Sequence, residues 1–110
     1  MSKKEDKFYE VKTTFSNQEE SLLLARKTVQ EKLAACAQVI PNMTAVYHWE
    51  NEIEEATEFL VVMKTEESLL KKLFAKIRSL HSYKTPEIIA VPIKKVDTDY
   101  SKWLESVLKI

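Results

Sequence analysis

The most restrictive feature of this sequence is that none of its 110 residues is glycine. Backbone positions with positive φ must therefore be filled by residues that carry a Cβ, and Asn tolerates the left-handed region best among them. We expect Asn42 and Asn51 to occupy turns of this kind. The same absence excludes the glycine-rich phosphate loops of nucleotide-binding proteins, where the backbone approaches the phosphates more closely than a Cβ allows.

The spacing of the apolar residues predicts the element order β-α-β-β-α-β, followed by one further helix. Alternation is typical of strands and predicts them at 8–15, 36–41, 43–50, 58–64 and 88–93. The ranges 36–41 and 43–50 belong to one strand, which is interrupted at Pro41-Asn42. This second strand and the third, at 58–64, form one long hairpin with a turn at Asn51. Pro92 removes a ladder donor, so the last strand is expected at a sheet edge.

Three helices are predicted from apolar residues at spacings of three and four, each with its own capping residue. Asn17 is expected to cap the first helix, Thr65 the second, and Asp97 or Thr98 the third. The residues expected to face the core are Leu22, Ala25, Val29 and Leu33 in the first helix, Leu69, Leu73, Ile77 and Leu80 in the second, and Tyr100, Trp103, Leu104 and Val107 in the third.

This order predicts an α+β ferredoxin-like domain over residues 8–110, with its helices on one face of an antiparallel sheet. Residues 1–7 are expected to form a flexible charged tail. Phe59–Met63 is apolar on both faces, as in a strand that is covered on both sides. Because all three helices are expected on one face of the sheet, the apolar residues on its other face would be left exposed to water. A second copy of the chain could bury them.

The charge balance argues against several classes of partner. Seventeen Lys and Arg offset seventeen Asp and Glu, so no long-range field favours nucleic acid or anionic lipid. The longest apolar run, Phe59–Met63, is too short to span a bilayer, and residues 1–7 lack the apolar segment of a signal peptide. With Cys36 as the only cysteine, we expect a chain without disulfides in the cytoplasm.

Cys36 and His81 are the first candidates for a metal site, because thiolate and imidazole bind copper and zinc. Their spacing matches no local metal motif, so distant segments would have to bring them together. Cys36 is also explained as a small buried residue between a helix and a strand. His81 is equally explained as a cap for the last helix carbonyls or as a general base.

Four other residues are candidates for a binding cleft. Trp49 alternates with Tyr47 on one hairpin face, as a stacking surface or a subunit interface would. Lys64 ends a strand, where its ammonium could receive an anion or simply be solvated. Tyr83 and Glu87 follow His81 in a segment broken by proline. No paired nucleophile and base accompanies them, so we expect a binding protein rather than an enzyme.

Three stretches together carry a family resemblance: Leu33-Ala-Ala-Cys36 with Val39-Ile-Pro41, then Val46-Tyr-His-Trp-Glu50, and finally Leu80 to Ile93. Tyr100-Ser-Lys-Trp-Leu104 agrees with them. In this combination and order, from about Phe8 to Val107, the chain resembles the CutA divalent-cation-tolerance family.

The resemblance implies a tightly packed homotrimer of ferredoxin-like subunits that exchange strand pairing through their long hairpins. It also implies copper tolerance and copper binding, with no obligatory cofactor. Carried over to this sequence, the cleft between subunits would use Cys36 and His81 for metal, and Lys64, Tyr83, Glu87 and Trp49 for ligand. The same cleft resembles that of PII-type trimers, which leaves a sensor or adaptor for a small anionic metabolite or partner protein as the alternative.

Overall fold

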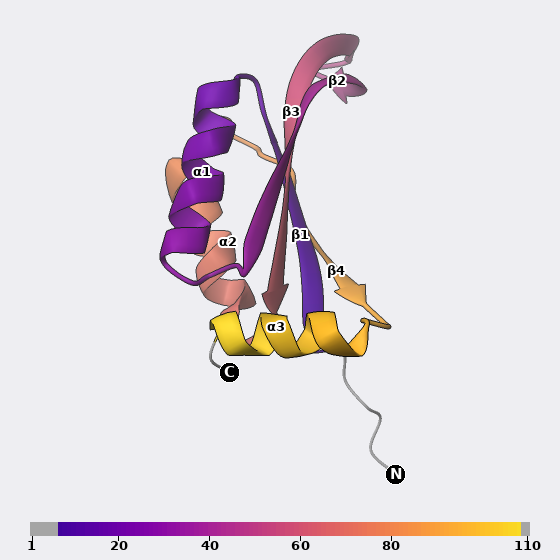
Figure 1. Cartoon of the computed structure of the whole chain (residues 1–110). Helices are drawn as coiled ribbons and strands as arrows, with labels where there is room; N and C mark the ends of the chain where they lie inside the picture. The colour runs from indigo at the N-terminus through magenta and orange to yellow at the C-terminus, as the bar shows by residue number, and fades with distance from the viewer. Residues whose placement is uncertain (1–6, 109–110) are drawn as a thin grey trace.

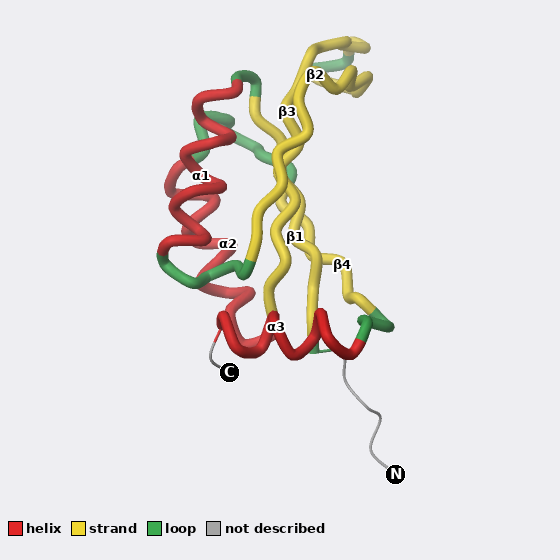
Figure 2. Tube along the Cα trace, viewed as in Figure 1, coloured by secondary structure: helices red, strands yellow, loops and turns green. Residues whose placement is uncertain are grey.

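The computed structural model describes residues 7–108 and forms one antiparallel sheet with three α-helices (Figure 1; Figure 2). The elements are β1 (Phe8–Phe15), α1 (Gln18–Gln30), β2 (Cys36–Trp49), β3 (Glu52–Glu66), a 3₁₀ turn (Glu67–Leu69), α2 (Leu70–Leu80), β4 (Ile88–Ile93) and α3 (Thr98–Leu108). The strand order β2-β3-β1-β4 confirms the ferredoxin-like fold class. Apart from Lys7, the tail expected at 1–7 lies outside the described residues.

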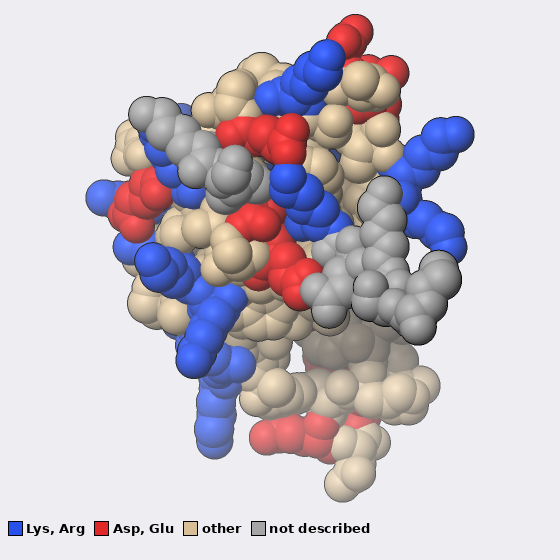
Figure 3. Space-filling view, turned by 90° about the horizontal axis from the view of Figure 1, so that it is seen from below, with Lys and Arg blue, Asp and Glu red and all other residues tan. Residues whose placement is uncertain are grey.

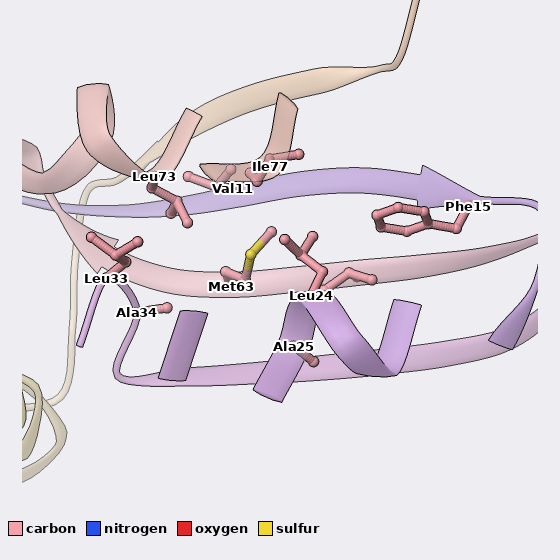
Figure 4. Packing of buried hydrophobic residues seen from close by; sticks show 10 residues of the cluster. Val11, Phe15, Leu24, Ala25, Leu33, Ala34, Met63, Leu73 and Ile77 are labelled. Carbon is pink, nitrogen blue, oxygen red and sulfur yellow. The ribbon is translucent and has the colours of Figure 1, made fainter. Parts of the chain in front are cut away.

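The main core lies between one face of the sheet and helices α1 and α2 (Figure 4). Val11 and Phe15 of β1 and Met63 of β3 meet Leu24 of α1 and Leu73 of α2. Side chains alternate across a strand, so this set defines which residues of each strand face the helices. β3 pairs with both β1 and β2 and is therefore an inner strand, as its apolar sequence predicts.

The other face of the sheet is covered only at one end, which corrects the expectation that all three helices share one face. Leu104 and Leu108 of α3 pack on Phe8, which points away from Val11 and Phe15. α3 therefore crosses the end of the sheet away from the hairpin (Figure 1). Beyond α3, this open face exposes three apolar residues, Ile40, Ile89 and Val91.

The β2–β3 hairpin extends well past the sheet. β1 pairs with β3 only as far as Phe59, so the segment from Met43 to Glu58, the hairpin arm, pairs only with itself. It curls away from the helices at the far end of the molecule (Figure 2). The arm leaves Val46 62% and Ile53 71% exposed on the same face, which gives it an apolar surface that another chain could cover.

Four of the described residues have positive φ, and the sequence predicted two of them, Asn42 and Asn51. Asn42 and Asn51 have φ values of 56° and 67°, and the register shifts between Ile40 and Met43 at the expected interruption. Glu50 and Lys32 also adopt positive φ, at 50° and 58°. These two were not predicted, because neither residue type favours the left-handed region.

Several local predictions are confirmed. The side chain of Asn17 accepts a hydrogen bond from the backbone N–H of Glu20 at 2.8 Å, and Asp97 accepts from Asp99 and Tyr100 at the start of α3. The bounds of β1 and β4 are those expected, and β4 is an edge strand.

The predicted cap of α2 is wrong, and two of the predicted helix faces are confirmed only in part, since Ala25 and Leu33 of the first and Leu104 and Val107 of the third do pack in the core. Thr65 does not cap α2, since β3 continues to Glu66, whose carboxylate caps the 3₁₀ turn through the N–H of Ser68. In α1 the buried residues are Ser21, Leu24, Ala25 and Thr28, whereas Val29 is exposed. In α3 they are Leu104 and Leu108, whereas Tyr100 and Trp103 are exposed and stack on each other.

Replacing Lys32 by Gly should raise the free energy of unfolding by about 1 kcal/mol, because a residue with a Cβ is strained at positive φ. Lys32 follows the C-cap of α1, with its N–H bonded to the carbonyl of Val29. Urea unfolding would measure the change. The matched control is Glu31→Gly, where φ is −86° and glycine should destabilise. A loss of stability in both variants would contradict the strain at Lys32.

Two further features concern the surface. Within residues 7–108, no helix is long and apolar enough to cross a membrane. The described residues on the face seen from below carry side chains of both charges (Figure 3).

Candidate functional site

A cleft of about 700 Å³ lies between the hairpin arm and the loop that joins α2 to β4. The arm contributes Tyr47, Trp49 and Glu58, and the loop contributes Tyr83 and Glu87. We call this the hairpin cleft. It brings together three of the four residues predicted to bind a ligand, namely Trp49, Tyr83 and Glu87.

Glu58 and Tyr83 form the polar centre of the hairpin cleft. The phenol of Tyr83 donates a hydrogen bond to Glu58 Oε2 at 2.9 Å. Burial, followed by this hydrogen bond, raises the pKa of Tyr83 to about 12. Tyr83 is therefore protonated at neutral pH and acts as a donor to the carboxylate.

Glu58 was not among the residues predicted from the sequence. It looked like one polar position in a strand, at the edge of the apolar run that begins at Phe59. The signal that could have found it is the hairpin register: Glu58 lies opposite Met43, on the face that also carries Tyr47 and Trp49. That register depends on the bulge between Ile40 and Met43.

His81 fixes the loop that forms one wall of the hairpin cleft. Its ring stacks on Phe15 with centroids 4.1 Å apart. Nε2 lies 2.7 Å from the carbonyl oxygen of Thr14, which can only accept, so Nε2 carries the proton. Nδ1 accepts from the backbone N–H of Tyr83 at 3.2 Å. Burial lowers the pKa of His81 although the bond to Thr14 opposes it, which favours this neutral tautomer.

Cys36 and Lys64 lie near the other end of the sheet, where they are directly opposite each other in β2 and β3. The half-buried Cys36 Sγ lies 3.6 Å from the hydroxyl of Tyr100. Burial and the contact with Cys36 raise the pKa of Tyr100 to about 12. Lys64 is held by Glu10 at 3.3 Å and by Gln38 at 3.1 Å, and it does not line the hairpin cleft.

The two predicted metal ligands are not neighbours within one chain. Cys36 shares its rung of the sheet with Lys64 and Glu10, whereas His81 contacts Thr14, four residues further along β1. At about 3.3 Å per residue, the two rungs are roughly 13 Å apart along the strands, and Cys36 on β2 also lies two strands away from Thr14 on β1. Across residues 7–108, no three His, Cys, Asp or Glu side chains are grouped so as to hold a metal ion. A metal site that uses both residues would need more than one subunit.

Comparison with known proteins agrees with the fold and the motifs. The sequence profile described as CutA1 divalent ion tolerance protein matches residues 9–107. The chloroplastic protein CutA of Arabidopsis thaliana is 40% identical over 96 residues, which make up 87% of this chain and 53% of the plant protein. The divalent-cation tolerance protein CutA of an Escherichia coli strain is 42% identical over 86 residues, or 78% of this chain and 77% of that protein.

The solved structures give the same result. The crystal structure of CutA1 from Oryza sativa is 37% identical and matches with a TM-score of 0.88, covering 93% of this chain and 94% of that chain. This chain spans about half the length of the Arabidopsis protein but nearly all of the rice structure. Because the profile match extends over almost the whole sequence and the fold agrees with it, the chain belongs to the CutA1 divalent ion tolerance family.

Proposed function

We propose that this chain acts in divalent-cation tolerance as a cytoplasmic homotrimer that binds copper or a similar metal ion in the clefts between its subunits. The observation that carries this proposal is the combination of an uncovered sheet face with a protruding apolar arm. The chain provides both parts of an interface and leaves both exposed: Ile40, Ile89 and Val91 on the open face, and Val46 and Ile53 on the arm.

A ring of subunits accounts for both surfaces at once. If the arm of each subunit packs on the open face of the next, the contact is heterologous, and such contacts either close into a ring or continue as a fibre. A closed trimer is the assembly that the resemblance to the family implies. It leaves neither an arm nor an open face exposed at its ends, and it brings segments of different subunits next to one another.

The proposed metal site rests on Cys36 and on the chemistry of the family. A half-buried thiol at the start of β2 is a suitable ligand for a soft ion such as Cu(I). His81 of a neighbouring subunit is the proposed second ligand, and its Nδ1 would become available when the N–H of Tyr83 is released. We propose a binding role and no catalytic one.

The small-anion alternative, which follows from the likeness to PII-type trimers, is less favoured by the geometry. It relied on the aromatic hairpin and on Lys64, and the charge of Lys64 is already offset by Glu10 at 3.3 Å. The hairpin cleft itself contains two carboxylates, those of Glu58 and Glu87, against the single ammonium of Lys84. This balance favours a cation over an anion.

Titration with Cu(I) under reducing conditions tests the metal proposal. Replacing Cys36 by Ala is expected to weaken binding about tenfold or more, because a direct ligand is lost. His81→Ala should weaken binding for the same reason, and Cys36→Ser should behave as Cys36→Ala does, since the volume is kept but the thiolate is lost. Equal affinity in the wild type and all three variants would remove both residues from the site. The control is His48→Ala on the exposed arm, which should bind as the wild type does.

A further inference from the structure

The open sheet face carries a charge cluster in which two ammonium groups share one carboxylate. Glu10 Oε2 lies 3.3 Å from Lys64 Nζ, and Glu10 Oε1 lies 3.4 Å from Lys12 Nζ. Lys64 also donates a hydrogen bond to the side chain of Gln38 at 3.1 Å. In the described part of the chain, no second carboxylate lies within ion-pairing distance of either lysine. The cluster therefore has one unbalanced positive charge, and Lys12 is the lysine with fewer partners.

Lys12 lies where the proposed assembly would cover the sheet. It points away from the helices, because Val11 beside it faces them, and it pairs across the strands with the exposed Ile89. The side chain of Lys12 is 35% exposed in one chain. A neighbouring subunit packed on Ile89 would remove water from this ammonium group, which is unfavourable unless the neighbour supplies a negative group. The subunit that covers this face must therefore bring a carboxylate to Lys12.

The hairpin arm can supply that carboxylate, since from Met43 to Glu58 it contains five Glu and neither Lys nor Arg. Glu55 is the one that shares a face with Val46 and Ile53, because it pairs with Val46 and lies two residues from Ile53. It is exposed and takes part in none of the ion pairs of residues 7–108. The others lie in the turn or on the face that lines the hairpin cleft: Glu50, Glu52, Glu54 and Glu58.

The two surfaces match position by position. On the arm, an exposed valine is paired directly with a carboxylate, Val46 with Glu55. On the open face, an exposed isoleucine is paired directly with an ammonium group, Ile89 with Lys12. Directly opposed residues of antiparallel strands have Cβ atoms about 4.5 to 5.5 Å apart, so the apolar and the charged side chain are equally spaced on both surfaces. When Val46 packs on Ile89, Glu55 can therefore reach Lys12.

We propose that Glu55 on the arm of one subunit forms an ion pair with Lys12 on the open face of the next, and that this pair selects a second copy of this chain as the occupant of that face. The inference rests on the proposed ring of subunits and adds the residues by which each subunit recognises the next. An ion pair inside an apolar contact acts mainly on the choice and register of the partner. An apolar segment without a carboxylate would leave Lys12 buried and unpaired.

Charge reversal in both directions tests this pair. Lys12→Glu and Glu55→Lys should each raise the concentration at which the oligomer dissociates about tenfold or more, because each places like charges against each other. The double variant restores opposite charges and should assemble as the wild type does. Sedimentation velocity over a dilution series measures all four proteins. A folding defect would persist in the double variant, so recovery there reports on the contact between subunits.

The matched controls make the same charge changes on the helices. Lys72→Glu lies at an exposed position of α2 and Glu19→Lys at an exposed position of α1, and both should dissociate at the wild-type concentration. The pair between Glu55 and Lys12 is overturned, and the ring stands, if the wild type is oligomeric and both single reversals dissociate as it does. Failure of the double variant to recover would also overturn the pair. A wild type that is monomeric throughout the dilution series would overturn the ring together with the pair.

Discussion

Truncation of Phe15 to Ala is expected to lower the free energy of unfolding by about 3 to 5 kcal/mol, the range found when a fully buried aromatic ring is removed. Phe15 is completely buried at the end of β1 and packs in the main core. Its ring also stacks on His81 at 4.1 Å, so its loss removes the support of the loop that begins at His81. Phe15 therefore connects core stability to the wall of the hairpin cleft.

Urea unfolding at a fixed protein concentration measures this effect, because stability depends on concentration in a self-associating protein. The control is Leu23→Ala, at an exposed position of α1, which should change stability by no more than about 0.5 kcal/mol. A stability close to that of the control would contradict the assignment of Phe15 to the core.

Introducing two negative charges on the open sheet face, by Ile89→Glu together with Val91→Glu, should abolish self-association. Both side chains are exposed and lie on the face opposite the helices, since they pair with Lys12 and Glu10. Burying an isoleucine or valine contributes about 1.5 to 3 kcal/mol. Burying an unpaired carboxylate instead is strongly unfavourable, and a symmetric ring would repeat the penalty at every interface.

Sedimentation velocity would report this change as a fall from an oligomer to the mass of one chain. The matched control is Leu23→Glu with Ala75→Glu, which adds the same charge at exposed positions of α1 and α2 and should leave the assembly intact. Copper affinity should fall with the first pair and persist with the second, if the metal site uses two subunits. Identical masses for the wild type and both pairs would contradict the assembly or its location.

The sequence alone determined the elements and their order, because the signals involved are local. Alternation predicted β1 and β4 with their observed bounds, and Asn17 and Asp97 were identified as caps from their positions before apolar runs. The absence of glycine placed Asn42 and Asn51 at positive φ. Backbone conformation at these positions depends on neighbours within a few residues, which the sequence displays directly.

Helix faces were less predictable, because small polar residues can be buried when they bond to their own helix. Thr28 donates to the carbonyls of Leu24 and Ala25, and Ser21 to that of Gln18. These residues therefore pack against the core without unsatisfied hydroxyls, and the buried face of α1 is rotated away from Val29. Counting apolar residues alone could not reveal this rotation.

The candidate site was decided by tertiary structure. The sequence identified Trp49, Tyr83 and Glu87 as binding candidates but provided no distances between them, and it did not single out Glu58. It also paired Cys36 with His81, which the sheet separates by roughly four residues along the strands, about 13 Å, and by two strands across the sheet. Which side chains meet depends on the bulge after Ile40 and on the curl of the hairpin arm over a loop that is distant in sequence, with Tyr83 lying 25 residues after Glu58. Contacts of that range follow from strand register and packing, which no local pattern specifies.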